Sequence, residues 1–598
     1  MNSAFICACV TIILGILVYF LYVKNIRSLK KNMLLALTTG VFSIAFLIYP
    51  LQIEYKNTFT RVMASFIYAL KCAGLGQNLQ VLSRINLNEI DGLLSFILVN
   101  ILFIAMPIIT GSFIMTFIEN IITKIGFTLL KNKELHIFSE VNSKSLLIAK
   151  KLQENKKARV VFTDVADVTD KSKINVKSVN MSGKITDIKF EKNKKMLNFY
   201  MISENEEENL HKTLELINKY KNRENIKINI VNNSEEASVI LDSTDKGKIS
   251  VEIINEKERA IFNLLDKTPL YLNSVDKTIS ILIVGCGKLG KEFLKNATWC
   301  SMMVGYKLEI LVIDVNAEKV RDNIYVEAPE ILDYYDIKFI TADIKSDEAI
   351  MALKKRPKVN YILVSMDNDN KNLEASIMLR RFYLREFKRE PIINLWILNE
   401  YKQEQILHIV NEKNNSYKLN AFGSFEDLYF RNNIVNSDIE RIAEQIHLTY
   451  CPEDINFERY NLLEYNKRSS RASGLHIKYK IYSILQDRYT DDMKENLRLF
   501  RELYNDEIEE KLTRNEHDRW NAYTRSIGYI HASIDEVKNY YDKTNYYVHY
   551  LARMHPALVT FEELDNLSVE LSKITGRNID MVGYDRDIIK FIRDRVEF

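Results

Sequence analysis

Three glycines with the spacing of a phosphate-binding turn stand near the middle of the chain, in the run Gly285-Cys286-Gly287-Lys288-Leu289-Gly290. The apolar segment ISILIV precedes them, and a helix is predicted to begin at them. In such a turn the first glycine permits the sharp bend, the second lets the backbone approach a pyrophosphate, and the third lets the helix pack on the strand. The next predicted strand, LEILVID, ends at Asp314, whose carboxylate could hold ribose hydroxyls. The pattern predicts a site for NAD(H) or another adenine nucleotide, with a turn kept only for packing as the alternative.

Catalytic and metal-binding patterns are absent from the sequence. The six cysteines form no C-x-x-C pair and no cluster with the nine histidines, and no G-x-S-x-G, H-E-x-x-H or P-loop occurs. Lysine and arginine, 82 in number, nearly balance 79 acidic residues, so no global basic field points to nucleic acid. We therefore expect no enzyme activity, no metal site, no nucleic-acid partner and a reducing compartment.

A short basic stretch occupies residues 466–471, with Lys478 beyond it. Charge runs of this kind are typical of a solvated loop, and we expect one here. Arg468, Arg471 and Lys478 could instead hold a phosphate, because guanidinium forks suit that geometry. The sequence leaves both interpretations open.

The elements that must position the glycine turn belong to an internal repeat. Residues 198–220 and residues 360–383 each contain a short apolar strand ending in serine, a polar loop, and an amphipathic helix opened by Asn-Leu. A strand-to-helix unit precedes each copy and a further strand follows it. Alternating strands and helices predict parallel sheets covered by helices, so we expect two tandem Rossmann-like α/β domains, at residues 130–255 and 275–440.

The first copy lacks the glycines. Residues 139–143 are Ser-Glu-Val-Asn-Ser where the second copy has its turn. Side chains there would crowd a pyrophosphate, and the charge of Glu140 would repel it. We predict that this copy binds no dinucleotide and serves as a dimerisation or coupling scaffold.

The tandem domains resemble the regulator-of-potassium-conductance (RCK, or TrkA-N) domains of prokaryotic channels and transporters. The resemblance covers roughly residues 130–440, and its most specific parts are the glycine turn and the helix start beginning at Ser365. It implies a ligand site around that turn. The residues it implies for the site are Gly285, Gly287, Lys288, Gly290, Asp314, Asp343, Asp367 and Asn372.

Long apolar runs are concentrated in residues 1–122 and predict an α-helical transmembrane region. Residues 4–23, 33–53 and 92–118 are each long enough to cross a hydrocarbon core, which takes about 20 residues. The loop between the first two is basic, so the positive-inside rule places it in the cytoplasm. We expect a multi-pass protein of the inner (plasma) membrane, with its N-terminus outside and its later domains in the cytoplasm.

A weaker apolar stretch, residues 59–76, contains Arg61 and Lys71 and is predicted to be re-entrant or interfacial. Its short half-helix ends in Gly74-Leu75-Gly76 between two longer apolar helices. This order resembles the pore unit of potassium-channel-like proteins, whose filter is a glycine-rich loop. An amphipathic helix resting on the outer leaflet is the alternative.

The C-terminal part contains a further resemblance, at residues 506–598, after a predicted helical connector with its basic loop at residues 441–505. A histidine, a tryptophan, a glycine-aromatic pair and a later H-P-x-L-V-x-F-x-x-L occur in the order typical of the small helical module repeated in ryanodine receptors. The resemblance implies a mainly α-helical domain whose ligand site would comprise His517, Arg519, Trp520, Tyr529 and His555. Taken alone, Trp520 is more typical of core packing and His517 of a structural histidine.

These features together predict a ligand-regulated membrane protein, an ion channel or channel-like effector gated by nucleotide binding in the cytoplasm. Enclosing a pore in the lipid bilayer requires assembly, so a channel would be a homo-oligomer, and we expect a tetramer. One alternative is a membrane-disrupting effector of a bacterial defence system that senses a nucleotide signal. Another is a membrane-tethered NAD-dependent oxidoreductase, for which the sequence offers no acid or base.

Overall fold

The computed structural model describes residues 133–597 with internal gaps, together with scattered positions between residues 57 and 100. The gaps are residues 155–157, 166–173, 189, 191–192, 398, 400–401, 403–405, 407–416, 425–427, 430–437 and 463.

The chain divides into two compact units, Met1–Leu130 and Lys131–Phe598. The helices expected at residues 4–23 and 33–53, most of residues 59–76 and 92–118, and the run Gly74-Leu75-Gly76 lie outside the described residues. Among the positions that the structure describes, no helix is both long and apolar enough to cross a membrane.

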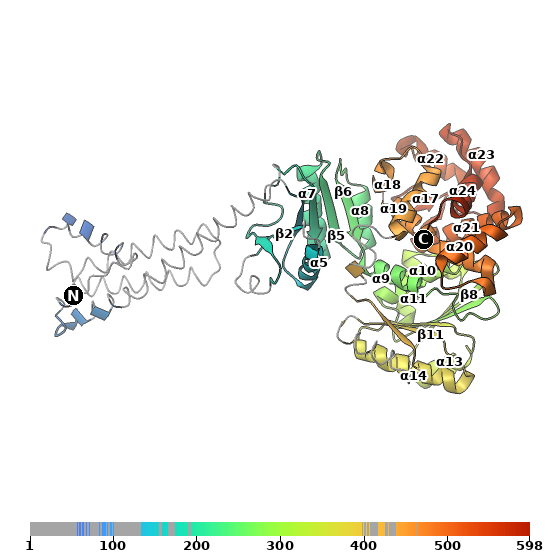
Figure 1. Cartoon of the computed structure of the whole chain (residues 1–598), viewed down its shortest axis with the longest axis horizontal. Helices are drawn as coiled ribbons and strands as arrows, with labels where there is room; N and C mark the ends of the chain where they lie inside the picture. The colour runs from blue at the N-terminus through green and yellow to red at the C-terminus, as the bar shows by residue number, and fades with distance from the viewer. Residues whose placement is uncertain are drawn as a thin grey trace. The chain divides into compact units, whose positions relative to one another are not determined.

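A six-stranded parallel sheet forms the first α/β domain of the second unit (Figure 1). Its strands, in spatial order, are β3 (Ser178–Asn180), β2 (Arg159–Phe162), β1 (Leu135–Phe138), β4 (Leu197–Met201), β5 (Ile226–Val231) and β6 (Ser250–Ile254). The order reverses between β1 and β4, as in doubly wound nucleotide-binding folds. At that point Phe138 is in register with Phe162 on one side and Tyr200 on the other.

The second α/β domain repeats this topology. Its strands, in spatial order, are β12 (Leu419–Phe422), β11 (Ile392–Trp396), β10 (Tyr361–Val364), β7 (Thr278–Val284), β8 (Lys307–Asp314) and β9 (Asp336–Thr341). All neighbouring pairs are parallel, and the order reverses between β7 and β10. The prediction of two tandem Rossmann-like sheets is confirmed.

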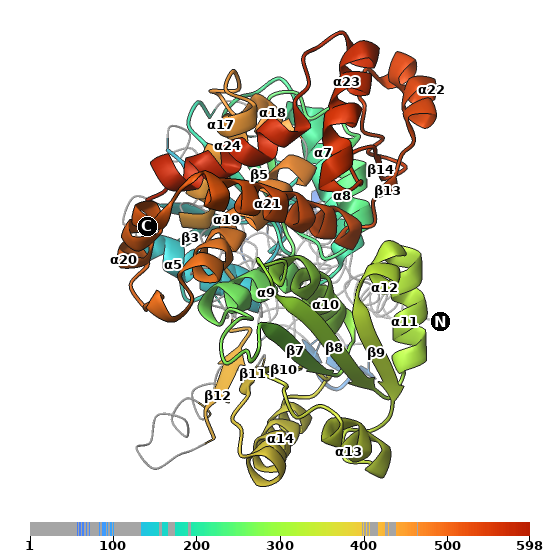
Figure 2. The same cartoon turned by 90° about the vertical axis from the view of Figure 1, so that its right-hand side faces the viewer.

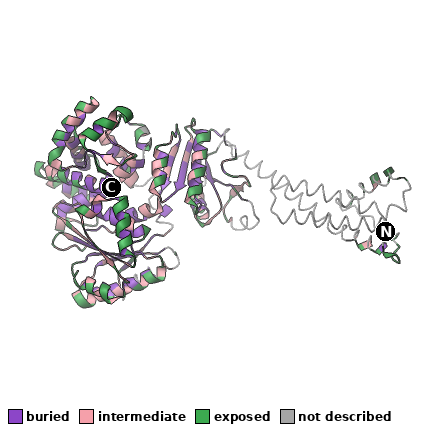
Figure 3. Ribbon diagram, turned by 180° about the vertical axis from the view of Figure 1, so that it is seen from behind, coloured by how far each residue is buried: buried purple, intermediate pink, exposed green. Residues whose placement is uncertain are grey.

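Helices cover both faces of the second sheet (Figure 2). One face packs on α9 (Glu256–Lys267), α10 (Lys288–Cys300) and α11 (Ala317–Glu327), and the other on α13 (Asp347–Lys354) and α14 (Asp369–Phe387). Successive strand residues point to opposite faces of the sheet. Ile283 therefore packs in the core under α9, α10 and α11, and Leu282 in the core under α13 and α14. Figure 3 shows the buried strands between helices whose outer faces are exposed.

Helices α5 (Ser143–Glu154), α7 (Glu206–Tyr220) and α8 (Glu235–Asp242) belong to the first domain. Side-chain caps fix where the latter two begin: Asn205 accepts hydrogen bonds from the first turn of α7, and Ser234 accepts one from α8. The glycine turn has no such cap at the start of α10, where Gly287 occupies the capping position.

The repeated asparagine has a structural role in both copies. Asn372 exchanges two hydrogen bonds with the backbone of Met366 and donates a third to the Trp396 carbonyl, over 2.8–2.9 Å. Asn209 does the same with the backbone of Ser203 and the Val231 carbonyl, over 2.8–3.0 Å. Each amide therefore ties the loop after one strand to the end of the next strand.

The C-terminal helical region, residues 438–597, follows the two sheets. Its main helices are α17 (Asp438–Tyr450), α18 (Glu458–Leu462), α19 (Glu464–Leu485), α20 (Met493–Leu503), α21 (Asp506–Ser526), α22 (Ile534–Thr544), α23 (Leu564–Thr575) and α24 (Met581–Asp594), with the short strands β13 (Ile530–His531) and β14 (Met554–His555). The loop expected at residues 466–471 is wrong, because these residues lie within α19. Helix α21 packs on α10, with the Tyr523 ring edge-on to Trp299 at 5.8 Å.

Candidate ligand sites

The glycine turn links the end of β7 to the start of α10, at the point where the strand order reverses. Gly285 has φ +79°, a conformation that L side chains rarely adopt. A Cβ there would lie 2.7 Å from Cγ of Met366 and 2.8 Å from its backbone nitrogen. The Ser365 hydroxyl donates to the Gly285 carbonyl over 2.7 Å. The turn and the end of β10 therefore hold each other, and only glycine fits at position 285.

The other two glycines serve different purposes. A Cβ on Gly290 would lie 2.6 Å from the Gly285 carbonyl oxygen, so this glycine lets α10 pack against the turn. Gly287 is not crowded, because a Cβ there would only make an ordinary contact with Oδ1 of Asp367, at 3.9 Å. Packing does not explain a glycine at position 287, whereas close approach of a ligand to the backbone does.

Asp314 lies at the end of β8, as predicted, and its carboxylate fixes the turn. Oδ2 accepts a hydrogen bond from the Cys286 N–H over 2.7 Å, and Oδ1 accepts one from the Asn316 N–H over 2.7 Å. Each carboxylate oxygen retains a second lone pair that could accept a hydrogen bond from a ribose hydroxyl. Asp314 therefore both shapes the turn and remains available to a ligand.

Two lysine ammonium groups flank the start of α10. Lys288 is the first residue of that helix and is exposed, and Lys257 lies in the first turn of α9. Burial lowers the pKa of Lys257, and the charge of Lys288 lowers that pKa further. Within residues 133–597, apart from the gaps, neither ammonium group forms an ion pair. An anion at the turn would relieve the repulsion between them.

The remaining residues implied for this site fall into two groups. Asp343 and Asp367 are exposed just beyond the ends of β9 and β10, and Asp343 accepts a hydrogen bond from the Lys345 N–H over 2.9 Å. Asn372 is fully buried, and both of its amide hydrogens are taken by backbone carbonyls. The structure therefore places both carboxylates at the edge of the sheet where the parallel strands end. Asn372 lies beneath that edge and positions the backbone of Met366.

The corresponding position in the first domain is closed by a side chain. Asn142 donates to the Ile202 carbonyl over 2.7 Å and to the Glu140 carboxylate over 2.8 Å. These bonds bridge the ends of β1 and β4, where the second domain has its open turn. Ser139 beside them is buried. The arrangement favours the prediction that this copy binds no dinucleotide.

Three of the residues implied for the C-terminal module pack against one another. His517 lies between the Asp585 carboxylate, 3.2 Å from Nδ1, and the Val559 carbonyl, 2.9 Å from Nε2. Burial lowers the pKa of His517, but its hydrogen bond to Asp585 and the charge of Asp585 raise that pKa above the ordinary value. The Trp520 ring lies 6.2 Å from the His517 ring and meets the His555 ring edge-on at 4.7 Å. These contacts indicate a structural cluster.

The other two residues of that set lie in different surroundings. Arg519 is 1% exposed and forms an ion pair with Glu516 at 2.8 Å, so it too supports the fold. The Tyr529 ring lies 5.4 Å from the Tyr465 ring, and both line a cavity. Tyr529 is therefore placed to contact a ligand, in the company of residues that the sequence did not single out.

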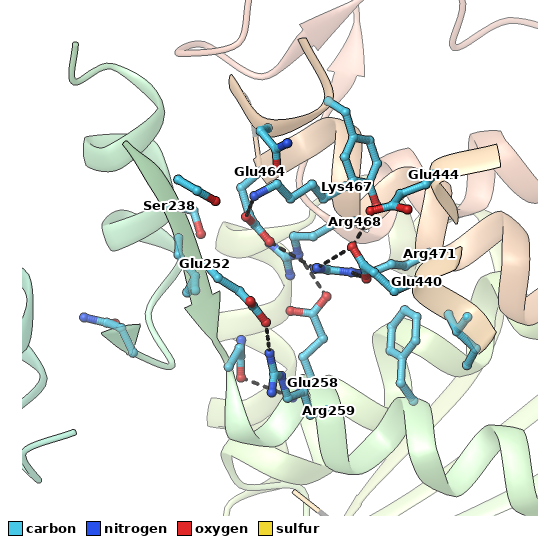
Figure 4. A pocket seen from close by; sticks show the side chains of 18 of the residues that line it. Ser238, Glu252, Glu258, Arg259, Glu440, Glu444, Glu464, Lys467, Arg468 and Arg471 are labelled. Atoms are coloured by element: carbon cyan, nitrogen blue, oxygen red, sulfur yellow. Dashed lines mark hydrogen bonds and ion pairs between the residues drawn. The ribbon is translucent and has the colours of Figure 1, made fainter. Parts of the chain in front are cut away.

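A larger cavity, of about 450 Å³, lies between the first α/β domain and the C-terminal helical region (Figure 4). Strand β6 with α8 and α9 forms one wall, and α17, α18 and α19 form the other. Arg468 and Arg471 both line it. Lys478 instead contacts Asp266 at 2.5 Å, so the three basic residues of the phosphate hypothesis are not brought together at this cavity.

Both arginines of the cavity already have carboxylate partners. Arg468 contacts Glu258 at 2.9 Å, and Arg471 contacts Glu440 at 2.6 Å and Glu464 at 3.3 Å (Figure 4). A phosphate would have to displace these carboxylates. The network joins α9, which also packs on the second sheet, to α17 and α19 of the C-terminal helical region. Its glutamates were not predicted from the sequence. Within the described part of the chain, no cluster of three or more His, Cys, Asp or Glu side chains could hold a metal ion.

Glu252, on the wall of this cavity, is expected to make the stability of the protein depend on acid pH. Burial raises the pKa of Glu252, but Lys227 at 2.7 Å and Arg259 at 2.6 Å lower it to about 2, from an ordinary value of 4.5. Because the folded-state pKa is depressed, this stabilisation is complete above about pH 4.5 and is lost as the pH falls toward 2. We expect Glu252→Gln to lower the free energy of unfolding by about 3 kcal/mol at pH 7 and by much less near pH 2.

Urea unfolding at a series of pH values measures this difference. The matched control is Glu236→Gln, an exposed glutamate of α8. A Glu252→Gln profile parallel to that of the parent protein across this pH range would contradict the assignment.

The fold and the turn define this part of the chain as a tandem Rossmann-like protein with one nucleotide-type turn. Neither a protein-family model nor a curated protein matches the chain. Solved structures of the GsuK channel are similar to it. One, the GsuK channel, has 14% identity and a TM-score of 0.32, covering 66% of this chain and 94% of that chain. GsuK bound to ADP has 13% identity and a TM-score of 0.31, with 67% and 96% covered. The GsuK channel bound to NAD has 11% identity and a TM-score of 0.32, with 67% and 81% covered.

Proposed function

We propose that residues 131–598 form a nucleotide sensor that binds NAD(H) or another adenine nucleotide at the turn Gly285–Gly290. We further propose that binding regulates the N-terminal region, acting as an ion channel or channel-like effector in the inner (plasma) membrane. The observation that carries the proposal is a glycine at position 287 that packing does not require, at the reversal point of a parallel sheet. Ligands of such sheets bind in the crevice at that point.

The charges around the turn support a nucleotide in one orientation. A pyrophosphate would meet the free backbone N–H groups at the start of α10, the positive end of the helix dipole, and the ammonium groups of Lys288 and Lys257. The carboxylates of Asp314, Asp343 and Asp367 would repel phosphate and accept hydrogen bonds from ribose hydroxyls. The sugar would therefore lie on the acidic side of the turn and the phosphates on the lysine side.

A continuous core provides the route for regulation. Apolar side chains of both α/β domains and of helices α19 and α21 form one buried cluster. A ligand shifts such an assembly only by binding one of its states more tightly than the other. We propose that the functional form is a homo-oligomer, a tetramer if the N-terminal region encloses a pore.

Gly287→Phe tests the site. The side chain would stand where a ligand must approach the backbone of the turn, so we expect the affinity for NAD, NADH and ADP to fall at least about 100-fold, with an unchanged unfolding temperature. Titration calorimetry of the full-length protein in detergent measures the affinity. The control is Gly183→Phe, because a Cβ on Gly183 would make ordinary contact with Ile188 at 3.6 Å.

Equal affinities of Gly287→Phe and the parent protein would place the ligand elsewhere. The regulatory part of the proposal needs a separate readout, which is current across planar bilayers in K⁺ or Na⁺ with and without the nucleotide. A current that is the same with and without the nucleotide would contradict the proposed regulation, even if the nucleotide binds at the turn.

A further inference from the structure

A second cavity, of about 320 Å³, lies beside the charged one and has walls of tyrosine. Its volume falls in the range of small-molecule sites, about 300–1,000 Å³. Helix α8 forms one wall, and the C-terminal helical region, which Figure 2 shows beside α8, forms the other. The tyrosines come from α19, from α21 and the residues after it, and from the segment between α22 and β14. They are Tyr465, Tyr523, Tyr529, Tyr546 and Tyr550.

The rings are arranged around Tyr465. Its centroid lies 5.4 Å from that of Tyr529, with 45° between the planes, and 5.7 Å from that of Tyr550, with 67° between the planes. Tyr546 meets Tyr550 edge-on at 5.7 Å. None of these pairs is stacked face to face, so ring faces remain for a further aromatic ring to lie against.

The hydroxyl groups of these rings lack partners in the protein. Among the described residues, those of Tyr465, Tyr529 and Tyr550 form no hydrogen bond. The Tyr523 hydroxyl is buried without a partner, on a residue that is 3% exposed. Burial raises the pKa of all four groups, so at neutral pH each is a hydrogen-bond donor. A buried donor in a native protein nearly always has a partner, so a ligand acceptor would satisfy the buried Tyr523 hydroxyl. The hydroxyls of Tyr465, Tyr529 and Tyr550 keep contact with solvent and could donate to further acceptors of the same ligand.

The charges at the rim are already neutralised. Arg553 forms an ion pair with Glu235 at 2.9 Å, Arg468 with Glu258 at 2.9 Å, and Asp242 with Lys246 at 3.5 Å. Neither a phosphate nor an ammonium group would find an unpaired counter-charge among these residues. The ligand that fits is therefore uncharged.

We propose that this cavity binds an uncharged, planar heteroaromatic ring of the nucleobase or nucleoside class, lying against the tyrosine rings and accepting hydrogen bonds from their hydroxyls. This site is separate from the glycine turn and does not depend on the function proposed for it. Because α8 forms one wall, the bound ring fastens the first α/β domain to the C-terminal helical region.

Equilibrium dialysis of the full-length protein in detergent against adenosine, guanosine, cytidine and uridine tests the proposal. We expect at least one nucleoside to bind, and Tyr523→Phe and Tyr529→Phe each to weaken it about fivefold with unchanged unfolding temperatures, since neither hydroxyl has a protein partner. Tyr465→Leu should weaken binding at least about 20-fold. The matched control is Tyr325→Leu, on α11, where the tyrosine is 60% exposed.

Parallel measurements on Gly287→Phe separate this site from the turn. Nucleoside binding that survives Gly287→Phe and falls in the three cavity variants supports the proposal, whatever happens to dinucleotide binding. The proposal is overturned if the parent protein binds no nucleoside, if the cavity variants bind as well as Tyr325→Leu, or if tetramethylammonium displaces the nucleoside and binds more tightly.

Discussion

Replacing Glu516 with glutamine is expected to lower the free energy of unfolding by about 3–5 kcal/mol. The carboxylate is fully buried in the C-terminal helical region, 2.5 Å from the Lys480 ammonium and 2.8 Å from the Arg519 guanidinium. Ser473 donates a further hydrogen bond to it over 3.1 Å. Burial raises the pKa of Glu516, but Arg519 and Lys480 lower it to about 2, so the group is ionised at neutral pH. Glutamine would leave two buried cations without a counter-charge.

Two further variants distinguish the loss of this buried charge from a general destabilisation by substitutions in α21. Glu507→Gln, an exposed position paired with Lys511 at the start of the same helix, should leave urea unfolding at pH 7 unchanged. Adding Lys480→Met to Glu516→Gln should restore part of the lost stability, because it removes one uncompensated cation. A Glu516→Gln midpoint equal to that of Glu507→Gln would show that the buried cluster contributes nothing.

Asn372→Leu is expected to lower the free energy of unfolding by about 3 kcal/mol, because three partly buried backbone groups lose their partner at about 1 kcal/mol each. The groups are the N–H and carbonyl of Met366 and the carbonyl of Trp396. Met366 also packs against Gly285, so the glycine turn should lose its shape. We therefore expect nucleotide binding at the turn to be abolished in calorimetry at temperatures where the variant remains folded.

The internal repeat supplies the control for this experiment. Asn209→Leu removes the same three kinds of hydrogen bond in the first domain and should cost similar stability. Its nucleotide affinity should stay within about twofold of the parent value, since it does not touch the turn. Loss of binding in Asn209→Leu as well would mean that Asn372 acts through overall stability and has no positioning role.

Sequence patterns predicted the parts of the fold that depend on local chemistry. Strand β7, the turn, helix α10 and Asp314 at the end of β8 all lie where apolar runs and glycine spacing placed them. The repeated asparagine could be found in the sequence because both domains have the same backbone geometry after a strand, and each copy needs an amide side chain to hold it. Its burial was not predicted, since a resemblance of position does not reveal that the Asn372 side chain faces the core.

Long-range charge pairing could not be predicted in the same way. Glu464, Lys467, Arg468 and Arg471 follow the i, i+3, i+4, i+7 spacing of one helix face, yet their polar composition favoured a loop. The carboxylates that hold Arg468 and Arg471 lie 210 and 31 residues away in sequence, and no local pattern connects them. The tyrosine cavity could not be predicted for the same reason, because its rings come from segments that meet only in the folded chain.

The two walls of the charged cavity are synthesised at different times. Strand β6 ends at Ile254 and α19 ends at Leu485, so at about 5–20 residues per second the ribosome adds the second wall on the order of ten to fifty seconds after the first. During that interval Glu252 can already pair with Lys227 and Arg259 of its own half, whereas Glu258 has only water until Arg468 is made. The Glu258 carboxylate is thus hydrated until the later helices emerge and close the cavity over it.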